Sequence, residues 1–143
     1  MANLTVVNSV ILLSVDGLFP VAQQLQQFSA ENIFETEEIE VAETSMGVDG
    51  TLSAGLVYVP ISQSYNLQAN SPSIATFDKI YQSQIAQKDV YKIQMSITIP
   101  ALGTKYTMTN GFLKKYPPTA NAHKIAQPRK FTIEWERISG AAV

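Results

Sequence analysis

The sequence predicts a single β-rich domain that contains one helix, and two observations carry this prediction. Several segments alternate between apolar and polar residues with the period of two that is typical of half-buried strands, most clearly from Tyr91 to Ile99. One further segment, from Ser71 to Asp89, spaces its apolar residues by three and four positions, as an amphipathic helix does. The chain has 143 residues and no internal repeat, so we expect residues 1–143 to form one domain around one core.

Four segments show the alternation of strands: residues 38–43, 62–69, 91–99 and 129–138. The first of them is strongly acidic. In the last, Phe131, Ile133 and Trp135 alternate with polar residues, which predicts one face on a core and one face toward solvent or a partner.

A hairpin is expected between residues 104–108 and 112–116. These two runs flank Asn110-Gly111, a dipeptide that readily takes the positive φ angles of a type I′ turn. Leu102-Gly103 is expected to join this hairpin to the strand before it, which would make residues 91–116 a meander of three strands.

The helix has clear signals at its start. Ser71 is a suitable N-cap and Pro72 fits the first helical position, where no backbone N–H is needed. One apolar stripe follows, and it contains Ile74, Phe77, Tyr81 and Ile85, with Ile80 beside it. We expect the helix to end by Asp89 and to pack this stripe on a sheet.

Two segments lack periodicity and are expected to be irregular. Residues 16–32 contain Asp16-Gly17, Pro20 and a glutamine-rich run, and residues 117–128 contain three prolines and the single histidine, His123. Long irregular segments in a small domain are usually functional or mobile.

Charge is scarce and unevenly distributed. Only 15% of the residues are charged, below the usual ~25%, which hints that partners cover part of the surface. Residues 1–78 carry nine Asp and Glu and no Lys or Arg, a net charge of −9, whereas residues 79–143 carry ten Lys and Arg against three Asp and Glu, a net charge of +7. The two halves could interleave and neutralise each other, or they could form oppositely charged faces that attract between copies.

The sequence offers no convergent chemistry. His123 lies in a polar loop without companions, no cysteine is present, and phosphate-loop, dinucleotide and hydrolase signatures are absent. We therefore expect no catalytic, cofactor or metal site and no sequence-specific binding of nucleic acid. The longest apolar run near the N-terminus, Val10–Val15, is too short for a signal peptide or a membrane span, so we expect a soluble protein without a membrane partner.

Three glycines fall within nine residues, from Gly47 to Gly55. Glycine permits turns, bulges and close approach of backbones. This segment is therefore either an ordinary bulged hairpin or a place where the backbone of another subunit comes close.

Several stretches resemble phage tail proteins of the tail-tube type. The similarity runs over residues 38–138 and is carried by the Gly47–Gly55 segment, by residues 65–72 that open the helix, by residues 99–106, and by residues 131–136. Residues 1–37 show no such resemblance. The family implies two packed antiparallel sheets, closed or nearly closed as a barrel, with one flanking helix. It also implies a homo-hexameric ring and rings that stack into a hollow tube for DNA.

The resemblance suggests roles for two groups of residues. We expect the acidic residues to face the lumen or a ring–ring contact; they are Glu35, Glu37, Glu38, Glu40 and Glu43. We expect a subunit-contact loop at Gly47, Asp49, Gly50 and Gly55. Partners would be further copies, other tail proteins such as sheath, tape measure or baseplate, and passing DNA. The protein would be assembled in the host cytoplasm and located in the virion tail.

Other interpretations remain open. Within the tail class, the chain could form a single tube-like ring at the junction of tube and baseplate. From a different class, a β-barrel could bind a small apolar ligand among Phe112, Tyr116 and Trp135, although core packing explains these aromatics equally well. An enzyme ranks third, because no catalytic residues converge.

Overall fold

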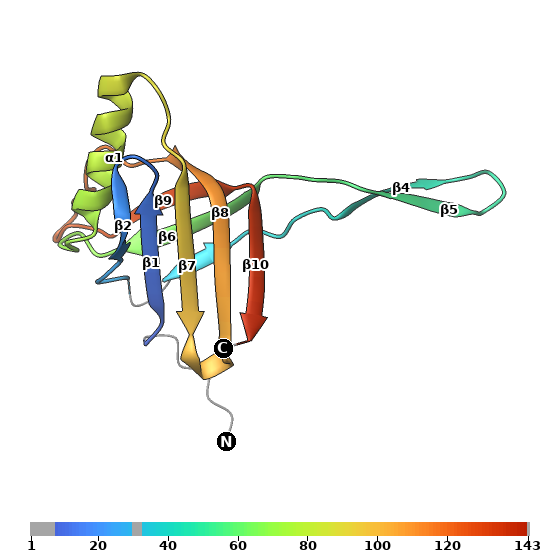
Figure 1. The fold of residues 1–143 in the computed structure, drawn as a ribbon, viewed down its shortest axis with the longest axis horizontal. Coiled ribbons are helices and arrows are strands. Elements are labelled where there is room, and N and C mark those ends of the chain that lie inside the picture. The colour runs from blue at the N-terminus through green and yellow to red at the C-terminus, as the bar shows by residue number, and fades with distance from the viewer. Residues whose placement is uncertain (1–7, 30–32, 143) are drawn as a thin grey trace.

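A computed structural model describes residues 8–29 and 33–142, and it consists of β-strands with one α-helix (Figure 1). The strands in chain order are β1 (Val10–Val15), β2 (Phe19–Gln24), β3 (Phe34–Thr36), β4 (Ala42–Met46), β5 (Leu52–Leu56), β6 (Ile61–Leu67), β7 (Ile93–Ile99), β8 (Thr104–Lys115), β9 (Arg129–Trp135) and β10 (Arg137–Ala142). The helix α1 (Ile74–Gln87) lies between β6 and β7, and a short 3₁₀ turn (Pro100–Leu102) connects β7 to β8.

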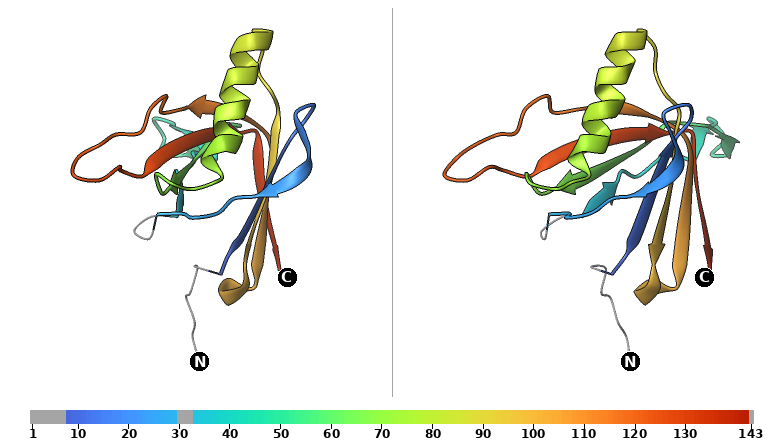
Figure 2. Two further views of the ribbon diagram at one scale, coloured as in Figure 1. Left: turned by 90° about the vertical axis from the view of Figure 1, so that its left-hand side faces the viewer. Right: turned by 60° about the vertical axis from the view of Figure 1, so that its left-hand side comes forward.

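The strands form two antiparallel sheets that share β8. We call β2-β1-β7-β8-β10 sheet A and β8-β9-β6-β3 sheet B, while β4 and β5 pair only with each other. The two sheets splay apart in Figure 2, and the helix lies over the open side between them. Within the described residues no pairing joins β2 to β3, so the sheets do not close into a barrel. The two-sheet architecture is confirmed, and the closed form of the barrel is wrong.

The expected hairpin at Asn110-Gly111 is absent, because residues 104–115 form one continuous strand. Asn110 does take a positive φ of 52°, but it makes a bulge in β8 instead of a turn. Gln94 holds Asn110 from β7: its Oε1 accepts from the Asn110 backbone N–H at 3.1 Å, and its Nε2 donates to Asn110 Oδ1 at 3.2 Å. The bulge bends β8 from sheet A into sheet B.

The core lies between the two sheets and the helix. Alternate residues of β1 and β7 point inward, as the period of two requires, and Ile93 to Ile99 show the pattern without a break. The fully buried side chains of largest volume are Trp135, Tyr65, Phe77 and Phe131. Leu13, Ile97 and Met108 of sheet A belong to the same core, and each of these residues is 0% exposed to solvent. The alternation predicted for residues 91–99 is therefore confirmed, and that predicted for residues 129–138 is confirmed as far as Trp135, where β9 ends.

A chain of hydrogen bonds runs through the core of sheet B. Trp135 Nε1 donates to the Tyr65 hydroxyl at 3.2 Å, the Tyr65 hydroxyl donates to Gln63 Oε1, and Gln63 Nε2 donates to Thr36 Oγ1 at 2.7 Å. Burial raises the pKa of Tyr65 well above its usual range. Because an unpaired polar group in this place would be costly, the chain fixes the order β9-β6-β3.

The helix begins at Ile74 and ends at Gln87, where Lys88 takes a left-handed conformation. Ser73, not Ser71, is the N-cap residue. The Ser71 hydroxyl donates to the carbonyl of Gln26 and accepts from the Ser73 N–H at 3.3 Å, so it ties the helix start to the segment after β2. The stripe is confirmed at its start and wrong at its end: Ile74, Phe77 and Ile80 are buried, whereas Ile85 is exposed.

Arg129 joins the helix to the irregular segment 117–128. Its guanidinium lies against the rings of Tyr116 and Phe131, contacts Asp78 of the helix at 3.4 Å and donates to the carbonyl of Pro117. Phe77 stacks on Phe131 with ring centroids 4.4 Å apart. The helix is therefore fixed against sheet B by both aromatic and charged contacts.

Two further expectations about local structure are wrong. The acidic segment 38–43 is not one strand, because residues 37–41 lie outside the strands and only β4 begins at Ala42. Residues 16–32 are not wholly irregular, because β2 forms an edge of sheet A opposite β1 in spite of Pro20. An edge strand tolerates a proline because one side of its backbone needs no sheet partner.

Gly111 provides a test of the bend in β8. A Cβ atom on residue 111 would lie 2.2 Å from Cε3 of Trp135, so the buried indole has room only because this residue is glycine. We expect Gly111→Ala to lower the free energy of unfolding by about 1–3 kcal/mol, the usual cost of overpacking. Urea unfolding followed by tryptophan fluorescence measures this change.

The matched control is Gly55→Ala on the exposed strand β5, where a Cβ would meet no atom within 4 Å. That variant should stay within about 0.5 kcal/mol of the parent. Equal stability of Gly111→Ala and the parent would contradict the packing of Trp135 on this backbone.

Candidate assembly surfaces

A long arm leaves sheet B between β3 and β6. It comprises residues 37–60 and projects away from the body of the molecule, with the β4–β5 ribbon at its far end (Figure 1). Every residue of β4 and β5 is exposed, and no core residue comes from the arm. A ribbon of two strands is marginally stable in water unless something covers one of its faces.

The register gives the ribbon two different faces. Three cross-strand pairs share one face: Met46 opposite Leu52, Thr44 opposite Ala54, and Ala42 opposite Leu56. The other face carries the pairs Ser45–Ser53 and Glu43–Gly55. Met46, Leu52 and Leu56 are 64%, 60% and 70% exposed, so the apolar face is open to solvent.

A tight turn closes the ribbon at the segment predicted to be a subunit-contact loop. Asp49 Oδ1 accepts from the Thr51 N–H at 3.0 Å, and the hydrogen bonds to Thr51 hold the pKa of Asp49 below its usual value. The Gly47 N–H donates to the Thr51 carbonyl at 2.8 Å, and Gly50 has a φ of +87°. The predicted residues Gly47, Asp49, Gly50 and Gly55 thus all lie on the ribbon, which is a hairpin in unbroken register without a bulge, and their role as a subunit contact stays a prediction.

The five glutamates expected at the lumen or at a ring–ring contact lie along the arm and at its base. Glu35 lies in β3 opposite Ser64, and the Glu37 N–H donates to the Ser62 carbonyl at 3.0 Å. Glu38 and Glu40 are exposed on the part of the arm between the body and the ribbon, and Glu43 lies on the polar face of β4. With Asp49 at the tip, the arm carries five acidic residues and no Lys or Arg.

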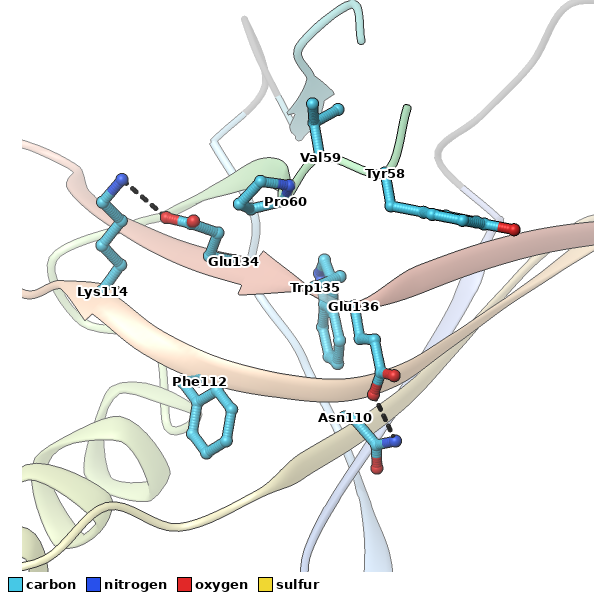
Figure 3. A pocket seen from close by; sticks show the side chains of 9 residues that line it. All are labelled: Tyr58, Val59, Pro60, Asn110, Phe112, Lys114, Glu134, Trp135 and Glu136. Carbon is cyan, nitrogen blue, oxygen red and sulfur yellow. Dashed lines mark hydrogen bonds and ion pairs between the residues drawn. The ribbon is translucent and has the colours of Figure 1, made fainter. Parts of the chain in front are cut away.

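An apolar pocket lies where the arm returns to the body (Figure 3). It has a volume of about 640 Å³, and its lining includes Tyr58, Val59 and Pro60 of the arm together with Phe112 of β8 and Trp135 of β9. Polar groups at its rim are paired, because Lys114 contacts Glu134 at 2.6 Å and Asn110 Nδ2 donates to Glu136 at 2.7 Å. Phe112 and Trp135 of the proposed ligand site line this pocket, whereas Tyr116 stacks on Tyr81 beside the helix.

A second hollow, which we call the basic cleft, lies beside the apolar pocket on the outer face of sheet B and shares Lys114 with it. Lys114, Lys115 and Lys130 line the basic cleft together with hydroxyl side chains and one carboxylate, that of Glu37. The hydrogen bond and the charge of Glu134 raise the pKa of Lys114, so this lysine stays charged at neutral pH. Phe112 and Trp135 of the apolar pocket could be named from the sequence, but neither its arm residues nor the basic cleft could, because these residues come from strands far apart in the chain.

Sheet A offers a third surface, its solvent face. Alternation and register place the polar residues Ser14, Gln94, Ser96, Thr98, Lys105, Thr107, Thr109, Arg137 and Ser139 on this face, together with the apolar residues Val10, Leu12 and Ala141. None of the strands β1, β7, β8 and β10 contains an Asp or Glu within its bounds. Side-chain hydroxyls and amides dominate the face, and its charged residues are basic.

Sheet A also has free edges. Within the described residues, β10 pairs only with β8 and β2 only with β1. The edge strand β10 has the sequence Arg-Ile-Ser-Gly-Ala-Ala. Beyond Arg137 at its start, it has no charged residue, proline or bulge of the kind that usually protects an open edge. Such an edge is able to pair with a strand of another copy.

The described residues contain no cluster of His, Cys, Asp and Glu suited to a metal ion, and none of their helices is long and apolar enough to span a membrane. His123 lies in the exposed segment 117–128, where its backbone N–H donates to the carbonyl of Ile125 at 3.1 Å.

The fold is similar to that of chains from contractile injection systems. A chain of the anti-feeding prophage (AFP) baseplate matches with a TM-score of 0.59 at 11% identity, covering 100% of this chain and 99% of that chain. A chain of an extracellular contractile injection system, the PVC sheath–tube complex in its extended state, matches with a TM-score of 0.57 at 17% identity, covering 93% and 88%. A chain of the AFP tube-terminating cap matches with a TM-score of 0.58 at 8% identity, covering 100% and 95%.

The sequence comparison is more specific. Residues 2–139 match the family model described as "Tail fiber protein gp32", and the chain belongs to this family. No protein with a curated function matches the sequence. The family match and the shared fold confirm the resemblance to tube-type proteins of contractile tails.

Limited proteolysis tests the exposure of the arm. The first 78 residues contain no Lys or Arg, so trypsin has no site there, whereas a glutamate-specific protease meets Glu38, Glu40 and Glu43 on the arm. In the isolated protomer we expect the first glutamate-specific cuts at these residues, because their backbone is exposed and lies outside the core. Mass spectrometry of the fragments identifies the sites. First cuts after Glu134 or Glu136, next to the buried Trp135, would contradict an exposed arm.

Proposed function

We propose that this chain is a structural subunit of the inner tube of a contractile phage tail. Six copies form a ring, rings stack into a tube, and the tube conducts the genome. The apolar face of the β4–β5 ribbon is the observation that carries this proposal. It exposes Met46, Leu52 and Leu56 on an arm that contributes nothing to its own core, so a second copy is needed to cover it.

The free edges of sheet A support closure into a ring. Pairing β10 of one copy with the β2 edge of the next would satisfy backbone groups on both strands. Such a contact joins two different surfaces of identical chains. Heterologous contacts of this kind close into rings when their rotation permits it, and otherwise extend as filaments.

In this arrangement the solvent face of sheet A lines the channel. Its hydroxyl and amide side chains form a wall without aromatic stacking groups, which are what retain the bases of nucleic acids. The acidic residues of the arm are then assigned to contacts between subunits and not to the lumen. The role is structural, without catalysis. Sheath, tape measure and baseplate proteins would be the other partners in the virion tail, after assembly in the host cytoplasm.

A second candidate within the same class is a ring that does not repeat, at the baseplate junction or at the end of the tube. The observation in its favour is that the similar solved structures include chains from a baseplate and from a tube-terminating cap. Such a protein would form single rings of the same subunit.

Removal of the ribbon tests the proposal. Val57 N–H donates to the Val41 carbonyl at 3.2 Å, so replacing residues 42–56 by an Asn-Gly turn closes the shortened hairpin where its strands already meet. We expect the parent to form rings or tubes with a central hole in negative-stain electron microscopy. The shortened variant should lose this assembly while it keeps the circular dichroism spectrum and thermal midpoint of the parent, because no core residue is removed.

Two neighbouring rungs of the ribbon supply a matched pair of variants. Met46→Ser with Leu52→Ser alters the apolar face, and Ser45→Ala with Ser53→Ala alters the polar face. We expect only the first pair to weaken assembly. Stacked tubes would favour the repeating subunit and single rings the junction protein. A parent that stays monomeric at every concentration, alone and with its tail partners, would overturn the proposal.

A further inference from the structure

The arm has an apolar face and a negative charge, and no other described part of its own molecule covers the first or neutralises the second. Its ribbon has an uncovered apolar face, and residues 37–60 carry five carboxylates without a single Lys or Arg. Any surface that covers the arm must therefore combine apolar area with positive charge.

One surface of the body combines these properties. The apolar pocket of Tyr58, Val59, Pro60, Phe112 and Trp135 adjoins the basic cleft of Lys114, Lys115 and Lys130. The two hollows share Lys114, and we call them together the groove. Glu37, Glu134 and Glu136 also line it, and Glu134 is paired with Lys114, so the positive charge that the groove offers to a partner is that of Lys115 and Lys130. Exposed lysines elsewhere, such as Lys92 and Lys124, line neither hollow.

The ribbon of the arm does not occupy the groove of its own molecule. Its own base, at Tyr58 to Pro60, forms one wall of the apolar pocket, and the ribbon extends from there away from the body (Figure 1). Each residue of β4 and β5 is exposed, so the ribbon makes no covering contact with its own sheet B.

We propose that this groove on sheet B receives the acidic arm of a second copy. The apolar ribbon face lies over the pocket, and the carboxylates of the arm lie near Lys115 and Lys130. The inference rests on the proposed assembly and adds the receiving surface. Because arm and groove are different surfaces, each copy gives one arm and receives another, so the contact propagates from copy to copy.

Charge reversal tests the pairing. Lys115→Glu with Lys130→Glu reverses the basic cleft, and Glu38→Lys with Glu40→Lys reverses the arm. We expect each double variant to need about tenfold or more protein for half-assembly in sedimentation velocity, because like charges then meet. An equimolar mixture of the two variants should assemble again, since each arm then finds a groove of opposite charge on the other variant. Lys92→Glu with Lys124→Glu, which makes the same change in net charge elsewhere, should assemble as the parent does.

Cross-linking tests the apolar end of the groove. The chain has no cysteine, so copies with Leu52→Cys can be mixed with copies carrying Phe112→Cys. Oxidation should give a disulfide-linked dimer that contains one copy of each variant. A mixture of Leu52→Cys with Ser139→Cys, on the opposite sheet, is the control and should give no such dimer.

The outcomes separate this inference from the proposed function. If the parent forms rings or tubes, and the Lys115 and Lys130 variant assembles equally well, the groove is not the receptor although the proposed function stands. If the mixture of the two charge variants fails to assemble while each remains folded, the pairing of arm with groove is also wrong. A small molecule found in the apolar pocket by native mass spectrometry, with assembly unchanged in the variants, would assign the pocket to a ligand and overturn the inference.

Discussion

The strand β8 belongs to both sheets, and the local geometry that permits this determines the arrangement of the other elements. Asn110 adopts a positive φ and is held by Gln94 and Glu136, while the absence of a side chain at Gly111 admits the indole of Trp135. The partner strand changes direction at the same level, where β9 ends at Trp135 and β10 begins at Arg137. One bend therefore creates two sheets, the core between them and the opening that the helix covers.

The same bend separates surfaces of different chemistry. Sheet A shows a face of hydroxyls and amides with free edges, whereas sheet B carries the arm, the apolar pocket and the basic cleft. Among the described residues, eight of the fourteen exposed large apolar side chains lie on the arm or in the groove at its base. A protomer with a well-packed core thus coexists with surfaces that expose apolar side chains and unpaired strand edges, as the proposed assembly requires. The low fraction of charged residues, 15% against the usual ~25%, agrees with that proposal.

Local patterns predicted much of this fold. The alternation in residues 91–99 and 129–138 and the apolar stripe that begins at Ile74 are set by burial on one face, which leaves a direct trace in the sequence. Asn110-Gly111 misled the prediction because the same backbone conformation serves a turn and a bulge, and only the distant Trp135 distinguishes them. The groove could not be predicted, because β8, β9 and the end of the arm come together only through the order of strands in sheet B. The acidic arm was visible as charge and glycine, but not as a single projecting hairpin.

The attachment of the arm has a mechanical consequence. Both of its ends continue into neighbouring strands of one sheet, because β3 and β6 pair directly from Phe34 and Tyr65 to Thr36 and Gln63. A force that pulls on the tip along the ribbon is carried by the covalent backbones of both strands in parallel. The hydrogen bonds between β4 and β5 are perpendicular to this force. The force then enters sheet B as shear between long paired strands, since β6 is bonded to β9 along its whole length. An appendage of marginal stability can in this way transmit a pull to the body of the molecule without its two strands being unzipped.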